Sequence, residues 1–239
     1  MSFFSTFQAI VNEAQDARLS EENRDPEETS ANLLRAERDR KVPTIQLVEE
    51  LIPGLKRSMA KPQRLIHDDP DYYIACDINT NTHYICYRTL LMIDIDFYKE
   101  SDKIKRDDPE YASKTRKRQE EIVNALEDYA LLNDIRFRIY RSRNGVHAFL
   151  ISREADYRKF SDIKIMFDNG CDFFYCVYSY IRGWSVRLNR KFHEQTMSYT
   201  LIKDVGEAKI DEYQEKLIDL HINLLDAFRE TEASSMFGN

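Results

Sequence analysis

Positions 90–97 read L-L-M-I-D-I-D-F, an apolar run that ends in two carboxylates one residue apart. The run predicts a buried strand, and on a strand residues i and i+2 point to the same face. Asp94 and Asp96 are therefore expected side by side. Because like charges repel and burying them unpaired is expensive, such a pair usually needs a cation, unless it stands at a solvated strand end. Carboxylate oxygens suit Mg²⁺ or Mn²⁺, so the stretch predicts a site for one of these ions.

The composition describes an ordinary globular protein with an unusually aromatic core. The chain has 239 residues, including 14 Tyr and 13 Phe, enough for one large domain or two small ones. A formal net charge of -7 argues against a protein that coats nucleic acid through its overall charge. It is compatible with a local basic groove. No apolar run approaches the ~18 residues of a membrane span, and the first residues lack the basic character of a secretory signal. A soluble intracellular protein without membrane contact is expected.

Charge and apolar spacing divide the chain into three parts. Residues 1–44 are densely charged and predict a helical or flexible arm. Residues 45–205 carry the strand and helix patterns of a central domain. Residues 206–239 predict a C-terminal amphipathic helix with a tail, its helix spanning 208–231.

Strand–turn–strand patterns, together with separate helical patterns, predict an α+β fold with a mixed or antiparallel sheet flanked by helices. Turn chemistry separates the elements, with N-T-N at 79–81 between two strands and S-R-N-G at 142–145 between two others. We expect strands at 72–77, 82–89, 136–141, 146–152, 173–180 and 185–189, and helices at 109–132 and 155–168.

Four cysteines raise the question of a zinc site. His67, Cys76, His83 and Cys86 fall within a short segment, but there is no C-x2-C pair and the spacings match no common structural zinc pattern. The simpler interpretation makes Cys76 and Cys86 small residues on neighbouring strands.

Three polar clusters interrupt the apolar strands, in a fixed order along the chain. Asp94 and Asp96 form the first. The second is the segment 142–147, a glycine-bearing turn that delivers His147 onto a strand. The third begins with Gly170, Cys171 and Asp172 and continues into the basic residues Arg182, Arg187, Arg190 and Lys191.

This order of side chains matches the needs of nucleotidyl transfer. Two divalent ions ~4 Å apart can hold an attacking hydroxyl and a leaving pyrophosphate, and holding them takes about three carboxylates. The triphosphate needs donors such as a histidine, a serine hydroxyl, the N–H groups of a glycine turn, and Arg or Lys. All of these are present in the sequence.

The hhhDhD strand, the S-x-x-G-x-H turn and the later single Asp resemble the motifs of the archaeo-eukaryotic primase superfamily, including small primase-polymerases of viruses and mobile elements. The resemblance covers roughly 72–191 and implies an RRM-like palm within the domain at 45–205. It implies metal binding by Asp94, Asp96 and Asp172, with phosphate contact by His147. The nucleotide-binding set expected from the turn and the basic strand is Ser142, Arg143, His147, Arg187 and Lys191.

The resemblance implies a DNA primase or primase-polymerase that makes or extends primers with two Mg²⁺ or Mn²⁺ ions. Nucleoside triphosphates and a single-stranded DNA template are its expected substrates, and a replicative helicase or another replisome subunit its expected partner. The third carboxylate stands in an unusual context, so Asp168 and Asp204 remain substitutes for Asp172. Two rival functions stay open: a catalytically degenerate nucleic-acid-binding or replisome scaffold, and an RRM-like RNA binder with exposed aromatics on its sheet.

Overall fold

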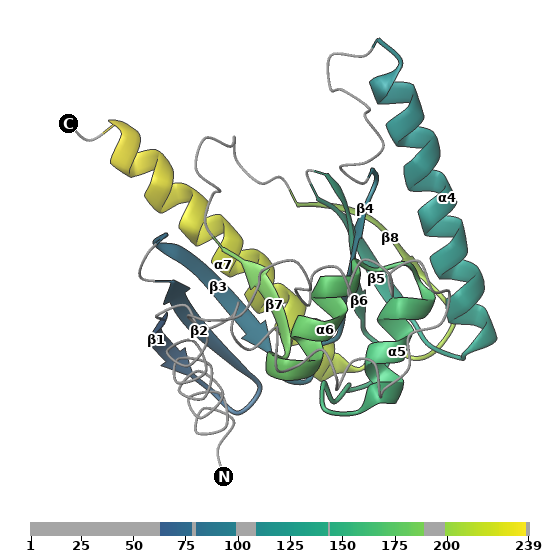
Figure 1. Ribbon diagram of the computed structural model, residues 1–239, viewed down its shortest axis with the longest axis horizontal. Helices are drawn as coiled ribbons and strands as arrows, with labels where there is room; N and C mark the ends of the chain where they lie inside the picture. The colour runs from purple at the N-terminus through teal and green to yellow at the C-terminus, as the bar shows by residue number, and fades with distance from the viewer. Residues whose placement is uncertain (1–62, 78–79, 99–108, 143, 189–198, 238–239) are drawn as a thin grey trace, which may run out of the picture.

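The structure is a computed structural model that describes residues 63–77, 80–98, 109–142, 144–188 and 199–237. Within these ranges it contains two antiparallel sheets and four helices, an α+β architecture as expected (Figure 1). The strands are β1 (Gln63–Asp68), β2 (Tyr72–Asp77), β3 (Thr82–Tyr87), β4 (Met92–Asp96), β5 (Phe137–Arg141), β6 (Gly145–Leu150), β7 (Trp184–Arg187) and β8 (Thr200–Val205). The helices are α4 (Tyr111–Leu132), α5 (Phe160–Asp168), α6 (Phe173–Arg182) and α7 (Glu212–Phe237). The expected arm at 1–44 lies outside the described residues.

The first sheet has the strand order β1-β2-β3-β7 and is built around the expected hairpin. Tyr72 pairs with Tyr87 and Asp77 pairs with Thr82, so β2 and β3 confirm the strands expected on either side of the polar turn. Cys76 and Cys86 lie on these neighbouring strands, and their thiols are free. The strand β1 was not expected from the sequence; it pairs with β2 and forms one edge of the sheet.

The second sheet has the order β4-β6-β5-β8, with every pairing antiparallel. The carboxylate strand β4 therefore lies at one edge, beside the strand that carries His147. Its inward residues Ile93 and Ile95 are buried at 0% and 4% exposure. This burial pattern confirms that the apolar half of β4 belongs to the core.

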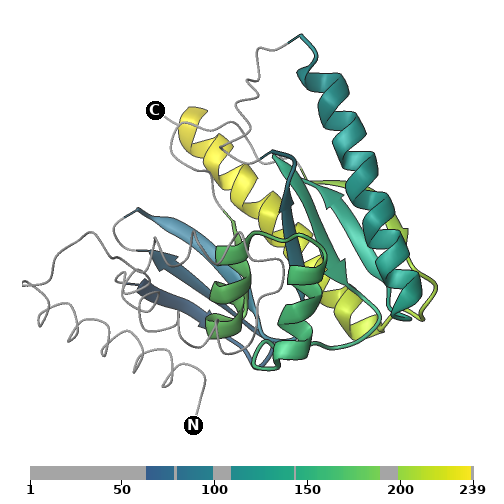
Figure 2. The same cartoon turned by 45° about the vertical axis from the view of Figure 1, so that its right-hand side comes forward.

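Two long helices cover opposite faces of the second sheet (Figure 2). The helix α7 contacts the face that carries Arg138 and Phe149, because Glu215 pairs with Arg138 and the His221 ring lies 5.3 Å from the Phe149 ring. The helix α4 covers the other face, where Lys203 of β8 reaches Glu127 at 2.7 Å. The sheet is therefore buried on both sides.

The helix α7 also joins the two sheets to each other. Tyr87 of β3 shares a 2.9 Å hydrogen bond with Nδ1 of His221, and the ring of Phe228 lies 5.2 Å from that of His83. Leu217 and Ile218 are buried in the same cluster as the strands. The C-terminal helix expected at 208–231 is thus part of the common core. None of the described helices is long and apolar enough to cross a membrane.

One expected strand is wrong. The segment expected as a strand at 173–180 forms the helix α6 instead. Its aromatic and β-branched composition favours a strand, but its buried residues recur at helical spacing, at Cys176, Val177 and Ile181. The Asp172 side chain caps the first turn by accepting a hydrogen bond from the Tyr175 N–H. Local capping and helical burial therefore outweigh residue preference.

Candidate functional site: a pocket between the two sheets

Asp94 and Asp96 point to the same face of β4 and line a pocket of about 350 Å³. Met92 lines the same pocket, as expected for the i and i+2 positions of a strand. The Asp94 side chain is 35% exposed, and Asp96 at the end of the strand is more open to solvent. The sequence prediction of two adjacent carboxylates on one face is confirmed.

On the edge of β4 that faces away from β6, the backbone of Asp94 is hydrogen-bonded to Cys171 and Asp172. Its N–H donates to the Cys171 sulfur at 3.3 Å, and its carbonyl accepts from the Asp172 N–H at 3.2 Å. The open edge of β4 is therefore covered by the segment that leads into α6. The third polar cluster of the sequence lies directly beside the first.

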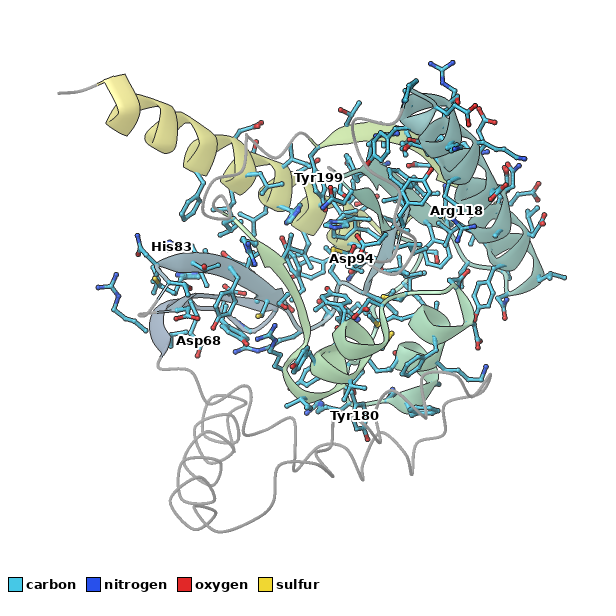
Figure 3. The ribbon with its side chains drawn as sticks, turned by 45° about the horizontal axis from the view of Figure 1, so that its top comes forward. Asp68, His83, Asp94, Arg118, Tyr180 and Tyr199 are labelled. Atoms are coloured by element: carbon cyan, nitrogen blue, oxygen red, sulfur yellow. The ribbon has the colours of Figure 1, made fainter. Side chains whose placement is uncertain are left out.

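His147 stands opposite Asp94 in the β4–β6 pair. Its Nε2 lies 3.3 Å from Asp94 Oδ1, and its Nδ1 is hydrogen-bonded to the Tyr199 hydroxyl. Asp94 and Tyr199 accordingly lie close together near the centre of the molecule (Figure 3). His147 lines the pocket, but both ring nitrogens already have protein partners.

The glycine turn holds β6 tightly against β4. The Ser142 N–H donates to the Gly145 carbonyl at 3.0 Å, and the Phe97 N–H donates to the Asn144 carbonyl at 2.8 Å. A Cβ atom at Gly145 would lie 2.0 Å from the Ile95 carbonyl oxygen, so only glycine permits this approach. Ser142 and Asn144 line the pocket as a result. Arg143 lies outside the described residues.

Two arginines from the first sheet and α6 form the opposite wall of the pocket. Arg187 of β7 stands opposite Tyr84 of β3, and Arg182 is the last residue of α6. The Arg182 Nη2 donates to Ser185 at 2.8 Å, and its guanidinium lies 5.7 Å from the Tyr84 ring centre. Neither arginine has a carboxylate partner among the residues that the structure describes. The Nε atom of Arg182 is buried and likewise has no hydrogen-bond partner within them.

Tyr175 adds a third unsatisfied group to the pocket. Its hydroxyl is buried and finds no hydrogen-bond partner in the described part of the chain. Burial raises the pKa of Tyr175 well above its ordinary value, and the nearby Asp94 carboxylate adds to this effect. The hydroxyl therefore keeps its proton and remains able to donate.

Asp172 has a structural role at the start of the helix α6. Its carboxylate accepts from the Tyr175 N–H at 3.0 Å, which makes it the N-cap of α6, and the side chain is exposed. It does not line the pocket, although its backbone is bonded to that of Asp94. No group of three or more His, Cys, Asp or Glu suited to a metal occurs among the described residues.

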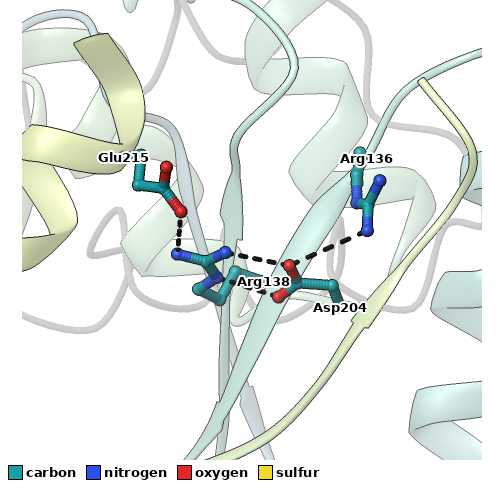
Figure 4. Close-up of polar contacts among 4 residues, drawn as sticks. All are labelled: Arg136, Arg138, Asp204 and Glu215. Carbon is teal, nitrogen blue, oxygen red and sulfur yellow. Dashed lines mark hydrogen bonds and ion pairs between the residues drawn. The ribbon is translucent and has the colours of Figure 1, made fainter. Parts of the chain in front are cut away.

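The two substitute carboxylates lie elsewhere. Asp168 pairs with Lys164 at 2.6 Å and accepts from the Tyr129 hydroxyl. Asp204 takes two hydrogen bonds of 2.9 Å from Arg138, which also binds Glu215 of α7 (Figure 4). The ion pairs of Arg138 with Asp204 and Glu215 join β5, β8 and α7, and none of these three residues lines the pocket. Lys191, the last expected nucleotide contact, lies outside the described residues.

A larger hollow of about 770 Å³ lies between the 68–70 turn and the segment 153–162. Its cations are matched by carboxylates, because Arg88 pairs with Asp68 at 2.6 Å and Arg153 pairs with the buried Asp162 at 2.7 Å. A charged ligand would have to displace these pairs. The smaller pocket is the better candidate, since its two arginines lack carboxylate partners among the described residues.

Sequence reasoning identified one wall of the pocket and part of the other. The sequence indicates Arg182 only as one of several basic residues, and it gives no sign that Tyr175 or Tyr199 belongs to the site. Arg182 lies just beyond the segment 173–180, which the sequence predicts as a strand. The sequence therefore does not indicate that the Arg182 side chain points into the pocket. Tyr199 precedes β8, which was not expected at all. No local pattern could have indicated either contact.

No family model matches the chain, and no curated protein or solved structure matches it. The functional interpretation therefore depends on the chemistry of the pocket.

Proposed function

We propose that this chain is a nucleotidyltransferase of the primase-polymerase type, which makes or extends primers on single-stranded DNA with Mg²⁺ or Mn²⁺. One observation carries the proposal: the pocket has paired carboxylates on one wall and, on the other, two arginines without a carboxylate partner among the described residues. A partly buried arginine charge without an anionic partner is unfavourable when no ligand is bound. An anionic ligand that also carries a cation would satisfy both walls.

The residues fit a divalent cation at the carboxylate wall. Asp94 and Asp96 would hold it, and Asp172 remains the proposed further ligand, since its backbone is bonded to Asp94. When bound, such an ion supplies positive charge that offsets the charge developing on phosphate oxygens. The buried Tyr175 hydroxyl gives the same region a neutral donor.

The arginine wall would bind the phosphates. Arg182 and Arg187 offer planar donors that match phosphate oxygens bidentately, and Ser142 adds a hydroxyl to the lining of the same pocket. Arg143 and Lys191 remain proposed contacts from the sequence. With both walls occupied, the reacting hydroxyl and the triphosphate would be held in line, and no protein nucleophile is required.

The arrangement of the second sheet supports a primase-type palm. The order β4–α4–β5–β6 brings the carboxylate strand and the histidine strand together as neighbours, with α4 on one face. The pocket face of β4 carries carboxylates where an RRM-like RNA binder would carry exposed aromatics. A template strand, nucleoside triphosphates and a helicase or other replisome subunit follow as proposed partners.

A primer-synthesis assay tests the proposal. Labelled nucleotides are supplied with single-stranded DNA and Mg²⁺ or Mn²⁺, and both ribo- and deoxyribonucleotides are tried. The double variant Asp94→Ala, Asp96→Ala should lose about a thousand-fold or more of the activity, because charge stabilisation worth several kcal/mol is removed. Asp168→Asn, a carboxylate outside the pocket, is the matched control and should be unchanged.

The outcomes separate the proposal from its main rival. Undiminished synthesis by the double variant would exclude these carboxylates from catalysis. Metal-dependent nucleotide binding without any incorporation by the wild-type protein would instead favour a catalytically degenerate scaffold.

A further inference from the structure

Tyr199 is joined to the carboxylate wall through His147. The Tyr199 hydroxyl is hydrogen-bonded to Nδ1 of His147, whose Nε2 lies 3.3 Å from Asp94 Oδ1. The Tyr199 ring meets the His147 ring edge-on, with centres 5.2 Å apart, and stacks on Tyr140 at 5.3 Å. A tyrosine distant in sequence is thus held firmly against the histidine that faces the proposed cation site.

The chemistry of the three groups favours one placement of the protons across the hydrogen bond and the 3.3 Å contact. An ionised carboxylate can only accept, so the hydrogen on His147 must be on Nε2 for it to donate to Asp94. Nδ1 of the neutral ring is then an acceptor, and the Tyr199 hydroxyl donates to it. Burial raises the pKa of Tyr199 well above its ordinary value, with a further contribution from Asp94, so the hydroxyl keeps the proton that this arrangement requires.

We infer that Tyr199 is a positioning residue, which holds His147 in the Nε2–H tautomer and thereby orients the Asp94 carboxylate toward the pocket. The part of this inference that concerns the His147 ring rests on the Tyr199–His147 hydrogen bond and the 3.3 Å contact with Asp94. Only its last step, the effect on cation binding, rests on the proposed function.

The physical consequence of losing the hydroxyl follows from the same geometry. Nδ1 of His147 would become a buried acceptor without a donor, and the Nδ1–H tautomer would become competitive. In that tautomer the Nε2 lone pair faces the Asp94 oxygen at close range, which is repulsive. Asp94 then loses its donor and turns away. Outer hydrogen-bond partners of this kind typically change metal affinity by about 10- to 100-fold.

The chain offers a matched control beside Tyr199. Tyr140 stacks on the ring of Tyr199, but its hydroxyl makes no hydrogen bond to any side chain among the described residues. Tyr199→Phe and Tyr140→Phe therefore remove the same atom from neighbouring rings. Only the first removes a donor to His147.

The experiment reads the tautomer directly. The protein is labelled with ¹⁵N in its histidines, and long-range proton–nitrogen spectra are recorded at about pH 8, above the ordinary imidazole pKa. The His147→Gln variant assigns the signals. We expect the Nε2–H pattern in the wild-type and Tyr140→Phe proteins, and a mixture of tautomers in Tyr199→Phe.

Mn²⁺ titrations followed by electron paramagnetic resonance test the last step. We expect about 10- to 100-fold weaker binding in Tyr199→Phe and unchanged binding in Tyr140→Phe. An Nδ1–H pattern in the wild-type protein, or an unchanged pattern in Tyr199→Phe, would overturn the inference. A changed tautomer with unchanged Mn²⁺ affinity would overturn its link to Asp94. If the wild-type protein bound no Mn²⁺ while the tautomer responded as expected, the cation site of the proposed function would fail and the positioning of His147 would stand.

Discussion

Asp94 and His147 face each other across the β4–β6 pair, with Nε2 of the histidine 3.3 Å from Oδ1 of the carboxylate. The strand register alone places them opposite, and Gly145 allows the two backbones to meet closely at the end of the pair. The histidine expected to contact phosphate is therefore also a direct partner of the carboxylate expected to hold metal. The two expected roles meet in a single close contact between a ring nitrogen and a carboxylate oxygen.

His147→Ala should weaken nucleotide binding in the presence of Mn²⁺ more than it weakens DNA binding. The substitution removes the donor to Asp94 and leaves the buried Tyr199 hydroxyl unpaired, which should also cost about 1–3 kcal/mol of stability. Fluorescence titrations with labelled nucleotide and with labelled single-stranded DNA compare the two effects. Equal nucleotide affinity in the variant and the wild-type protein would count against a role of His147 in the site.

Arg182→Met should weaken triphosphate binding by about 10- to 100-fold, since a hydrogen bond to a charged group contributes about 1.5–3 kcal/mol. It should leave Mn²⁺ affinity unchanged, because Arg182 lies on the wall opposite the carboxylates. Stability should stay within about 1 kcal/mol of wild type, since no ion pair with a described residue is broken. Calorimetry with a triphosphate measures the first effect.

Arg118→Met is the control for Arg182→Met. Arg118 is exposed on α4, and within the described part of the chain it pairs with Glu121 one turn away at 3.2 Å. It should bind triphosphate like the wild-type protein. Equal losses in both variants would point to general electrostatic attraction and not to a phosphate contact.

Asp172→Ala should lower the free energy of unfolding by about 1 kcal/mol, because it removes the N-cap of α6. Asp172→Asn keeps a good capping side chain and should retain wild-type stability. Urea unfolding of the two variants tests this difference. A stable Ala variant would show that the cap contributes nothing.

The Asn variant also isolates the charge of Asp172. Because this carboxylate does not line the pocket, we expect Asp172→Asn to reduce Mn²⁺ affinity less than Asp94→Asn does. An equal or larger loss would make Asp172 a full ligand.

Acid should destabilise the protein through His221. Burial lowers the pKa of His221 from 6.5 to about 3, with a smaller contribution from His147. Between these values the unfolded chain binds a proton that the folded chain does not, so stability is lost as the pH falls below about 6.5. The slope is at most about 1.4 kcal/mol per pH unit.

His221→Asn keeps a polar atom near the Tyr87 hydroxyl and removes the titration. Between about pH 7 and pH 5 the wild-type protein should lose about 2 kcal/mol more stability than this variant does. Urea unfolding at the two pH values measures the difference. Identical losses in both proteins would show that His221 is protonated in the folded state or contributes nothing.

The parts of the fold that follow local rules could be predicted from the sequence. The hairpin of β2 and β3 has polar turn residues between aromatic and β-branched strands, and α4 follows from helical spacing. The sequence does not predict the strand β8. This strand lies at a sheet edge and its residues are mostly exposed or half-buried, so its apolar pattern is weak. The sequence predicts a strand where the helix α6 forms, because the aromatic and β-branched residues of this segment favour a strand.

The sequence by itself determined that Asp94 and Asp96 share one face of a buried strand and that a glycine turn precedes His147. Both follow from rules that act within a few residues, since side chains alternate along a strand and glycine favours a turn. The tertiary structure alone decided what these groups meet. Arg182 reaches the pocket because α6 and the first sheet pack against the second, and Tyr199 reaches His147 from 52 residues away because β8 pairs with β5. Such contacts depend on how separate elements pack, and no local period in the sequence encodes that packing.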